Sequence, residues 1–167
     1  YFNQSTQAQR NYRGGGGYDN PYWTVNRNPF NEDVNREYGY AQASYKFWDW
    51  MTVSYRLGGD VYSQDSKNFY DIKSSAFPAG KGIITDYFNN QYNSDLTVNL
   101  QKSFGSNWSG NLLLGQNYFY TKSKSRLTIG DGLITPTFFD IVNALSYSAS
   151  ELDGEKRTAA VYGQAEL

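Results

Sequence analysis

Polar and apolar side chains alternate with a period of two along several segments of this 167-residue chain. The odd positions are apolar or aromatic and the even positions are polar from residue 41 to 47, and again from residue 51 to 57. Similar alternation, with a few exceptions, runs through residues 95–104, 108–115 and 158–167. Successive side chains of a strand point to opposite faces, so each segment predicts a β-strand with one apolar and one polar face.

Short connections and long polar segments alternate between these predicted strands. Only residues 48–50 separate the first two strands and only residues 105–107 the next two, so each pair predicts a tight hairpin. Loops beyond about 15 residues are uncommon inside compact domains. We therefore expect an extracellular loop at 1–36, a hairpin at 37–61, an extracellular loop at 62–91, a hairpin at 92–120, an extracellular loop at 121–157 and the start of a next strand at 158–167.

This organisation predicts an all-β fold, an antiparallel transmembrane β-barrel to which the chain supplies about five strands with short periplasmic turns and long extracellular loops. We expect the rest of the barrel to come from sequence outside this chain. The apolar positions expected to face lipid are Val53, Tyr55, Leu57, Val98, Leu100, Leu112 and Leu114. The charged positions expected to face the lumen are Arg56, Asp95 and Glu166.

An energetic argument favours this register. A slip of one residue reverses every side chain of a strand, so it would point Arg56 at lipid at a cost of about 2–4 kcal/mol near the midplane. Aromatic placement agrees, because Trp and Tyr gather at membrane interfaces. The residues expected in the periplasmic girdle are Phe47, Trp48, Trp50, Phe104 and Trp108, and those expected in the outer girdle are Tyr118, Phe119 and Tyr120.

A soluble β-sandwich is the structural alternative, because there the same alternation would separate core from solvent. A sandwich usually turns every 8–12 residues or so, and nothing in it requires tryptophan at the short turns. Five strands with one apolar face would also leave two open edges. We therefore favour the barrel.

Composition excludes several kinds of chemistry. The chain has no Cys and no His, so thiol nucleophiles, histidine triads and the usual zinc sites are absent. Its net charge of -1, without a basic block, gives no electrostatic footprint for nucleic acid. The 16 Tyr, 10 Phe and 4 Trp suit a surface where one end of a ring is wet and the other is not.

Two further motifs carry no chemistry. The run Gly14–Gly17 lacks the Lys-Ser/Thr pair of a phosphate-binding loop, so we interpret it as a flexible loop tip. Asp131, Asp140 and Asp153 offer oxygen ligands that suit calcium but lack the EF-hand spacing, so we assign no metal site. We expect no catalytic residue and no cofactor.

Several segments, in chain order, resemble SusC/RagA-type TonB-dependent outer-membrane transporters. These segments are Asn20–Phe30, Glu32–Arg36, Ser44–Trp50, Val53–Gly58, Tyr92–Leu96, Gly130–Ile134 and Val161–Gly163. The resemblance implies a barrel of about 22 strands around an N-terminal plug. It also implies a TonB-coupling segment, a SusD-like surface lipoprotein over the mouth, and import of glycan fragments, peptides or similar nutrients in a Gram-negative outer membrane. This chain would be a middle portion of the barrel, without the plug or the coupling segment.

The resemblance implies the partners, and the predicted loops supply the ligand candidates. The partners are the rest of the barrel and the plug, the SusD-like lipoprotein, the lipid bilayer and, through the missing N-terminal part, the TonB complex. Aromatic residues of the predicted loops could stack on sugar faces or peptide groups, or could pack the loops together or against the lipoprotein; they are Tyr22, Trp23, Phe69, Tyr70, Phe138 and Phe139. The lumen-facing charges could line the solute path or pair with the plug.

The leading hypothesis is thus a segment of a nutrient importer without catalysis. Two alternatives stay open. One is a soluble, aromatic-rich carbohydrate-binding β-sandwich. The other is a SusC-like structural component of a larger outer-membrane complex.

Overall fold

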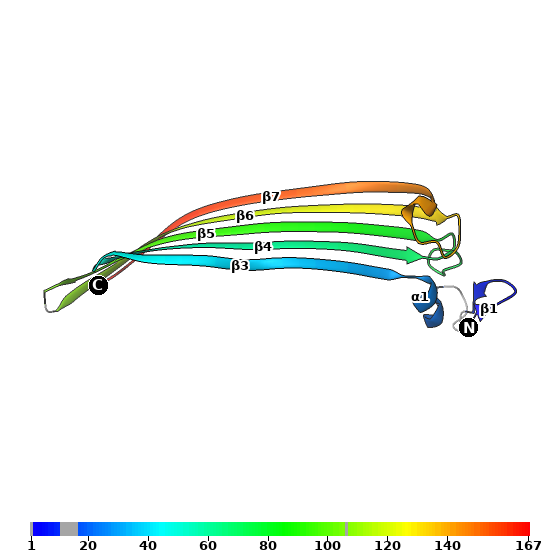
Figure 1. Cartoon of the computed structure of the whole chain (residues 1–167), viewed down its shortest axis with the longest axis horizontal. Helices are drawn as coiled ribbons and strands as arrows, with labels where there is room; N and C mark the ends of the chain where they lie inside the picture. The colour runs from blue at the N-terminus through cyan, green and yellow to red at the C-terminus, as the bar shows by residue number, and fades with distance from the viewer. Residues whose placement is uncertain (1, 11–16, 106) are drawn as a thin grey trace. The chain divides into compact units, whose positions relative to one another are not determined.

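The computed structural model describes residues 2–10, 17–105 and 107–167, and it is mostly β, with 73% strand and 6% helix. Five long strands form one antiparallel sheet in the order β3-β4-β5-β6-β7, so each strand pairs with its neighbour in sequence (Figure 1). The elements are β1 (Phe2–Asn3), β2 (Ala8–Gln9), α1 (Pro21–Arg27), β3 (Phe30–Trp48), β4 (Met51–Tyr70), β5 (Lys81–Phe104), β6 (Trp108–Leu133), a 3-10 turn η1 (Ile141–Asn143) and β7 (Ala144–Glu166).

The chain divides into two compact units, and β3 to β7 contribute residues to both. We call one the loop unit; it comprises Tyr1–Val34, Ser63–Tyr87 and Lys124–Leu152. We call the other the turn unit; it comprises Asn35–Tyr62, Phe88–Ser123 and Asp153–Leu167. Each unit is described by itself below.

The two predicted hairpins of the turn unit are confirmed. β3 ends at Trp48 and β4 begins at Met51, while β5 ends at Phe104 and β6 begins at Trp108. Gly105 follows β5 with a φ of 75°, a left-handed conformation that glycine adopts without steric cost. The alternation of apolar and polar residues therefore located these turns correctly.

The predicted boundaries of the three long loops are wrong, because the strands extend much further. The connections are residues 71–80 between β4 and β5 and residues 134–143 between β6 and β7, in place of the loops expected at 62–91 and 121–157. β3 likewise begins at Phe30, inside the loop expected at 1–36, and α1 lies before it. The added strand segments are mostly polar and have only short stretches of apolar alternation, such as Leu127 and Ile129, yet sheet pairing still satisfies their backbone groups.

The described residues that reach full burial all belong to the loop unit. The buried hydrophobic residues are Trp23, Phe69 and Leu133, and the buried polar ones are Asn20, Asp71, Ser74 and Asn143. Within the turn unit, no described residue is buried. In the described ranges, no helix combines the length and the apolar character needed to cross a membrane.

Candidate functional site

One face of the turn unit carries a connected set of polar side chains. Arg56 Nε lies 3.9 Å from Asp95 Oδ2, and the Arg56 guanidinium lies over the ring of Tyr40, 5.6 Å from its centroid. Asn117 Nδ2 donates to Asn93 Oδ1 at 2.9 Å and to Asp95 Oδ1 at 2.5 Å. The structure thus brings together two of the three charged residues expected to face a lumen, on adjacent strands of one hydrophilic face.

The third residue, Glu166, lies apart from that pair. Its Oε1 accepts a hydrogen bond of 2.6 Å from Gln164 Nε2, two residues earlier on β7. Residues two apart on a strand share a face, so this contact is local. Glu166 does not line the depressions described next.

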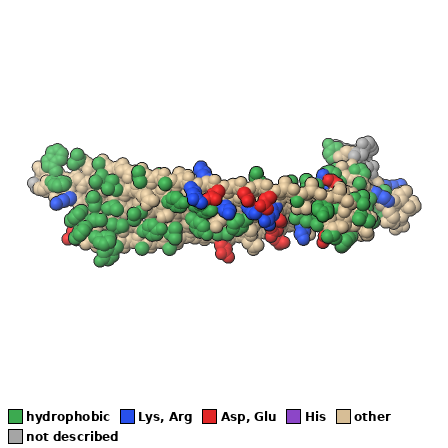
Figure 2. Space-filling view, turned by 90° about the horizontal axis from the view of Figure 1, so that it is seen from above, with side chains coloured by type: hydrophobic (Ala, Val, Ile, Leu, Met, Phe, Trp, Pro, Cys, Tyr) green, Lys and Arg blue, Asp and Glu red, His purple; other side chains and the backbone are tan. Residues whose placement is uncertain are grey.

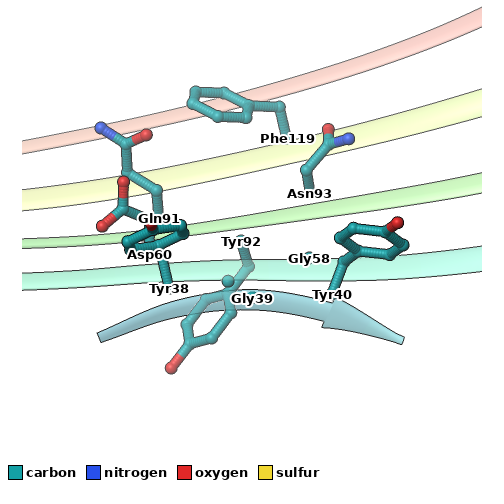
Figure 3. A pocket seen from close by; sticks show the side chains of 10 residues that line it. Tyr38, Gly39, Tyr40, Gly58, Asp60, Gln91, Tyr92, Asn93 and Phe119 are labelled. Carbon is teal, nitrogen blue, oxygen red and sulfur yellow. The ribbon is translucent and has the colours of Figure 1, made fainter. Parts of the chain in front are cut away.

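A depression of about 290 Å³ opens on the hydrophilic face (Figure 3). Its aromatic boundary is formed by Tyr38 and Tyr40 of β3 and by Phe119 of β6. Gly58 contributes to its floor, where a Cβ would lie 3.7 Å from both Tyr40 Cβ and the Gly39 carbonyl oxygen. The glycine therefore keeps the floor open between the rings.

Polar groups complete the depression. Asp60, Gln91 and Asn93 line it, while Tyr92 is directed to the other side of the sheet (Figure 3). Arg36 holds Asp60 with two hydrogen bonds, Nε to Oδ1 at 3.0 Å and Nη2 to Oδ2 at 2.7 Å. Flat aromatic faces beside amide and carboxylate groups can stack on and hydrogen-bond a polar solute.

A second depression of about 270 Å³ surrounds the Arg56–Asp95 pair. Gln42, Ser54 and Thr97 add hydroxyl and amide groups to it, and Tyr162 of β7 forms one side. The hydrophilic face therefore offers polar recesses rather than a flat surface.

The opposite face of the turn unit is apolar and uncovered. Tyr55, Leu57, Leu112 and Leu114 are between 37% and 47% exposed. The other three residues expected to face lipid, Val53, Val98 and Leu100, are half-buried. Figure 2 shows hydrophobic side chains gathered over the half of the sheet that carries the short turns. Among the described residues, only neighbouring side chains of the same face cover these seven apolar residues.

Aromatic rings cluster beside the short turns, as the sequence predicts. Trp48 and Trp50 stack with ring centroids 5.1 Å apart, and Tyr45 meets Phe47 edge to face at 4.8 Å. The expectation that Phe119 belongs to the outer girdle is wrong, because its side chain lines the depression on the hydrophilic face. Alternation explains this outcome: Tyr120 stacks on Tyr92 across the apolar face, so the intervening Phe119 must point the other way.

Most of the aromatic ligand candidates are occupied by packing inside the loop unit. The ring of Trp23 is buried, and its Nε1 donates to Ser74 Oγ at 3.0 Å. Phe69 is buried near Phe139, with ring centroids 6.0 Å apart, and Tyr70 packs on Phe77 at 4.7 Å. Phe69 and Tyr70 also end β4 rather than lying in a loop.

Two candidates keep an accessible ring. Tyr22 on α1 is 61% exposed, and Phe138 in the connection before η1 is 50% exposed. They are the members of the predicted set whose faces a ligand or a partner could cover.

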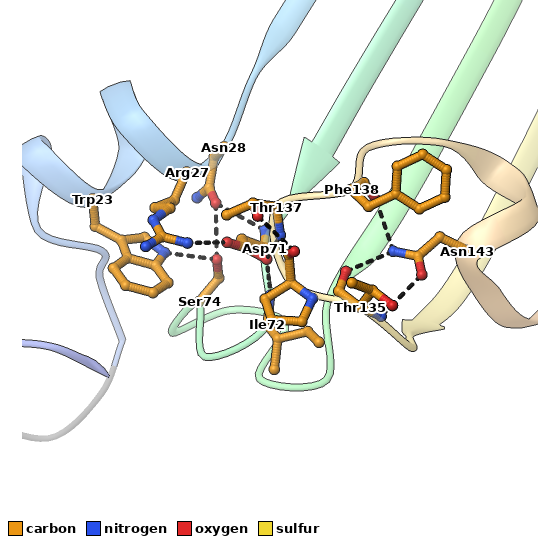
Figure 4. A network of polar contacts seen from close by, with 11 residues as sticks. Trp23, Arg27, Asn28, Asp71, Ile72, Ser74, Thr135, Thr137, Phe138 and Asn143 are labelled. Atoms are coloured by element: carbon orange, nitrogen blue, oxygen red, sulfur yellow. Dashed lines mark hydrogen bonds and ion pairs between the residues drawn. The ribbon is translucent and has the colours of Figure 1, made fainter. Parts of the chain in front are cut away.

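Asp71 is the centre of a buried network that sequence reasoning missed (Figure 4). Its Oδ2 lies 3.1 Å from Arg27 Nη1, while its Oδ1 accepts the backbone N–H groups of Ile72 at 2.9 Å and Thr137 at 3.0 Å. Asn28 Oδ1 accepts the N–H of Asp71 at 3.1 Å. The sequence around an aspartate in a polar segment does not predict whether its side chain is buried, so the burial of Asp71 is visible only in the fold.

That network fixes α1 against both long connections of the loop unit. Asn20 caps the helix by accepting the N–H of Tyr22, and Pro21 occupies the first turn, where its missing N–H is not needed. Ser74 Oγ then donates to Asn28 Oδ1 at 2.9 Å, just beyond the helix. The helix and the connections are thus held by polar contacts more than by an apolar core.

Two of the acidic residues weighed as calcium ligands have other partners. Asp131 lies 3.3 Å from Lys81 Nζ, and Asp140 accepts the N–H of Val142 at the start of η1. Across the described ranges, no group of three or more acidic side chains gathers as a metal site would require. Gly14, Gly15 and Gly16 lie outside the described residues.

No family model matches the chain, and no curated protein matches its sequence. The informative features are a sheet with one uncovered apolar face, a recessed hydrophilic face and a polar-bonded loop unit.

Proposed function

We propose that this chain forms part of the wall of an outer-membrane transport barrel. In this proposal the apolar face of the turn unit contacts lipid and the hydrophilic face lines an aqueous passage. Import of a glycan fragment, peptide or similar solute, with a SusD-like surface lipoprotein and TonB-driven coupling, follows from the resemblance to SusC/RagA-type transporters. No catalytic step belongs to the proposal.

The uncovered apolar face is the observation that carries it. A strand that crosses a bilayer needs about 9–11 tilted residues. The turn-unit parts of the strands exceed that length; they are residues 35–48, 51–62, 88–104, 108–123 and 153–166. Lipid would cover the side chains that no described residue covers, and the aromatic cluster at Trp48 and Trp50 would lie at the periplasmic interface.

The sheet edges also support a barrel. β3 and β7 are the outer strands of the sheet, so each has one edge without a partner strand among the described residues. Long open edges invite uncontrolled pairing, and closure into a barrel removes them. A soluble carbohydrate-binding sandwich would instead need a second sheet over the apolar face, and the described strands of the turn unit supply none.

Single cysteines can test which face meets lipid, because the chain has no Cys of its own. The matched pair is Val98→Cys and Thr97→Cys, neighbours on opposite faces of β5. In membranes of cells that make the protein, we expect a bimane label at position 98 to be quenched by nitroxide-labelled lipid chains. A label at position 97 should instead respond to a water-soluble quencher.

A second pair, Leu112→Cys and Asn111→Cys, repeats the comparison on β6. The proposal is wrong if neither label is quenched by lipid, or if the protein fractionates without membranes and both apolar positions are protected from every reagent. The second result would favour a soluble body with a covered core.

A further inference from the structure

A cavity of about 310 Å³ lies within the loop unit beside the Arg27–Asp71 pair. Its lining residues come from the N-terminal segment, from α1 and from both long connections. Of the aromatic ligand candidates, Trp23 lines it, and the hydrophilic face of the turn unit contributes none of its lining residues. Three members of the polar network drawn in Figure 4 line it: Arg27, Asp71 and Thr137.

Backbone strain is concentrated around this cavity. Gln7, Lys73 and Thr137 have φ values of 51°, 75° and 63°, and they are the non-glycine residues with positive φ among those that the structure describes. All three line the cavity. A left-handed conformation is costly for a β-branched residue such as threonine. Strained residues of this kind cluster at ligand sites, where the surrounding structure holds them in place.

The charges of the lining favour an anion. Arg27, Lys73 and Asp71 are its ionisable residues. Asp71 already has partners on both carboxylate oxygens, because Arg27 pairs with one and two backbone N–H groups donate to the other. Among the described residues, the guanidinium makes one hydrogen bond, to Asp71, out of the five N–H donors that arginine offers.

Lys73, the second cation of the lining, strengthens the preference of the cavity for an anion. Lys73 Nζ donates to the Thr6 carbonyl oxygen at 2.6 Å, which leaves an exposed ammonium with further donors. Apolar walls accompany the charges, because Trp23, Ile72 and Pro136 also line the cavity. Such a site suits a small ligand that has a carboxylate and a nonpolar or ring-shaped body.

We infer that this cavity binds the carboxylate group of a small solute, with the free guanidinium edge of Arg27 and the ammonium of Lys73 as its donors. A hexuronic acid and the C-terminus of a short peptide share this chemistry. The inference goes beyond the proposed function and does not depend on it, since the cavity belongs to the loop unit alone.

Equilibrium dialysis of the intact protein, in detergent if it needs detergent, tests the inference with paired probes. Glucuronate is compared with glucose, and an acetylated dipeptide is compared with its C-terminal amide. We expect at least one carboxylate to bind with a Kd of about 1 mM or tighter while its neutral counterpart does not. The pair that shows the difference identifies the source of the carboxylate.

Variants locate the site. Lys73→Gln removes one cation and should weaken carboxylate binding about tenfold, whereas Lys67→Gln, an exposed lysine of the loop unit outside the cavity, should leave it unchanged. Arg27→Lys keeps the charge beside Asp71 but loses the planar fork, and a loss of about fivefold is expected. Equal binding of charged and neutral probes, no binding of either carboxylate, or equal effects of the two glutamine variants would overturn the inference.

Discussion

The loop unit and the turn unit share the same five strands, but different forces stabilise them. In the loop unit, buried side chains such as Asp71, Ser74 and Asn143 hydrogen-bond one another or the backbone. In the turn unit no described side chain is buried, and the mostly apolar side chains of one face have no cover from other described elements. In the proposal above, lipid covers the apolar face of the second unit, whereas the first unit is held together by its own polar contacts. The experiments below separate these two modes of stabilisation.

The largest effect is expected from the buried acid of the loop unit. Asp71→Ala removes the carboxylate that pairs with Arg27. It also leaves the backbone N–H groups of Ile72 and Thr137, which donate to that carboxylate in the wild type, without an acceptor. Loss of one member of a buried pair costs about 3–5 kcal/mol. Because Arg27 is partly exposed, we expect about 2–4 kcal/mol, measured as increased protease cleavage within residues 71–80 and 134–143.

The control for this variant is Asp49→Ala in the turn unit. Asp49 pairs with Lys46 at 2.9 Å but is fully exposed, so its loss should leave the cleavage pattern and the unfolding midpoint unchanged. Comparable sensitivity of both variants would show that the Asp71 network contributes no more than a surface pair.

The next effect compares the two faces of the turn unit. Val98→Arg would place a charge on the apolar face, and Thr97→Arg would place the same charge on the hydrophilic face. If the apolar face meets lipid, the first variant should lose about 2–4 kcal/mol and the second almost nothing. Urea unfolding of the refolded protein in lipid vesicles measures both values. Equal losses would argue against a lipid-facing surface.

The same contrast explains which parts of the fold the sequence could predict. Alternation located the hairpins around residues 49–50 and 105–107, because one apolar face imposes a period of two. Residues 62–70 and 121–133 carry this pattern only over short stretches, yet they form strands, since backbone pairing with a neighbour does not require an apolar face. Mostly polar strands were therefore mistaken for loops.

The candidate sites were likewise predictable only where they depend on alternation along a strand. Alternation placed Arg56 and Asp95 on one face, but their pairing with each other depends on the register of β4 and β5. The depression beside this pair was not predictable, because Tyr38, Asp60 and Phe119 come together only when the four strands β3 to β6 are aligned. The roles of Asp71 and Lys73 were equally hidden, since burial and a positive φ in a polar connection depend on tertiary contacts.

A smaller effect is expected from hydroxyl groups in the two units. Ser74→Ala removes the acceptor of Trp23 Nε1 and the donor to Asn28, both inside the buried network. An unsatisfied buried polar group costs about 1–3 kcal/mol, so the loop unit should become measurably easier to unfold. Ser44→Ala removes an exposed hydroxyl that pairs with Ser54 at 2.8 Å, and water can replace it. A difference between the two variants in protease sensitivity checks the prediction.

The smallest effect should come from pH acting on the surface of the loop unit. Lys124 Nζ and Arg126 Nε lie 2.7 Å and 2.6 Å from the Glu151 carboxylate, and these hydrogen bonds hold its pKa below the ordinary value of about 4.3. The folded protein therefore binds this proton more weakly than the unfolded chain does. The resulting stability is fully present above about pH 4.3 and is lost as the pH falls through the lowered pKa. Unfolding midpoints measured across this window should fall more steeply for the wild type than for Glu151→Gln, which has no carboxylate to protonate. Because the group is exposed, salt should diminish the difference, and parallel pH profiles at low salt would show that the two cations confer no stability through Glu151.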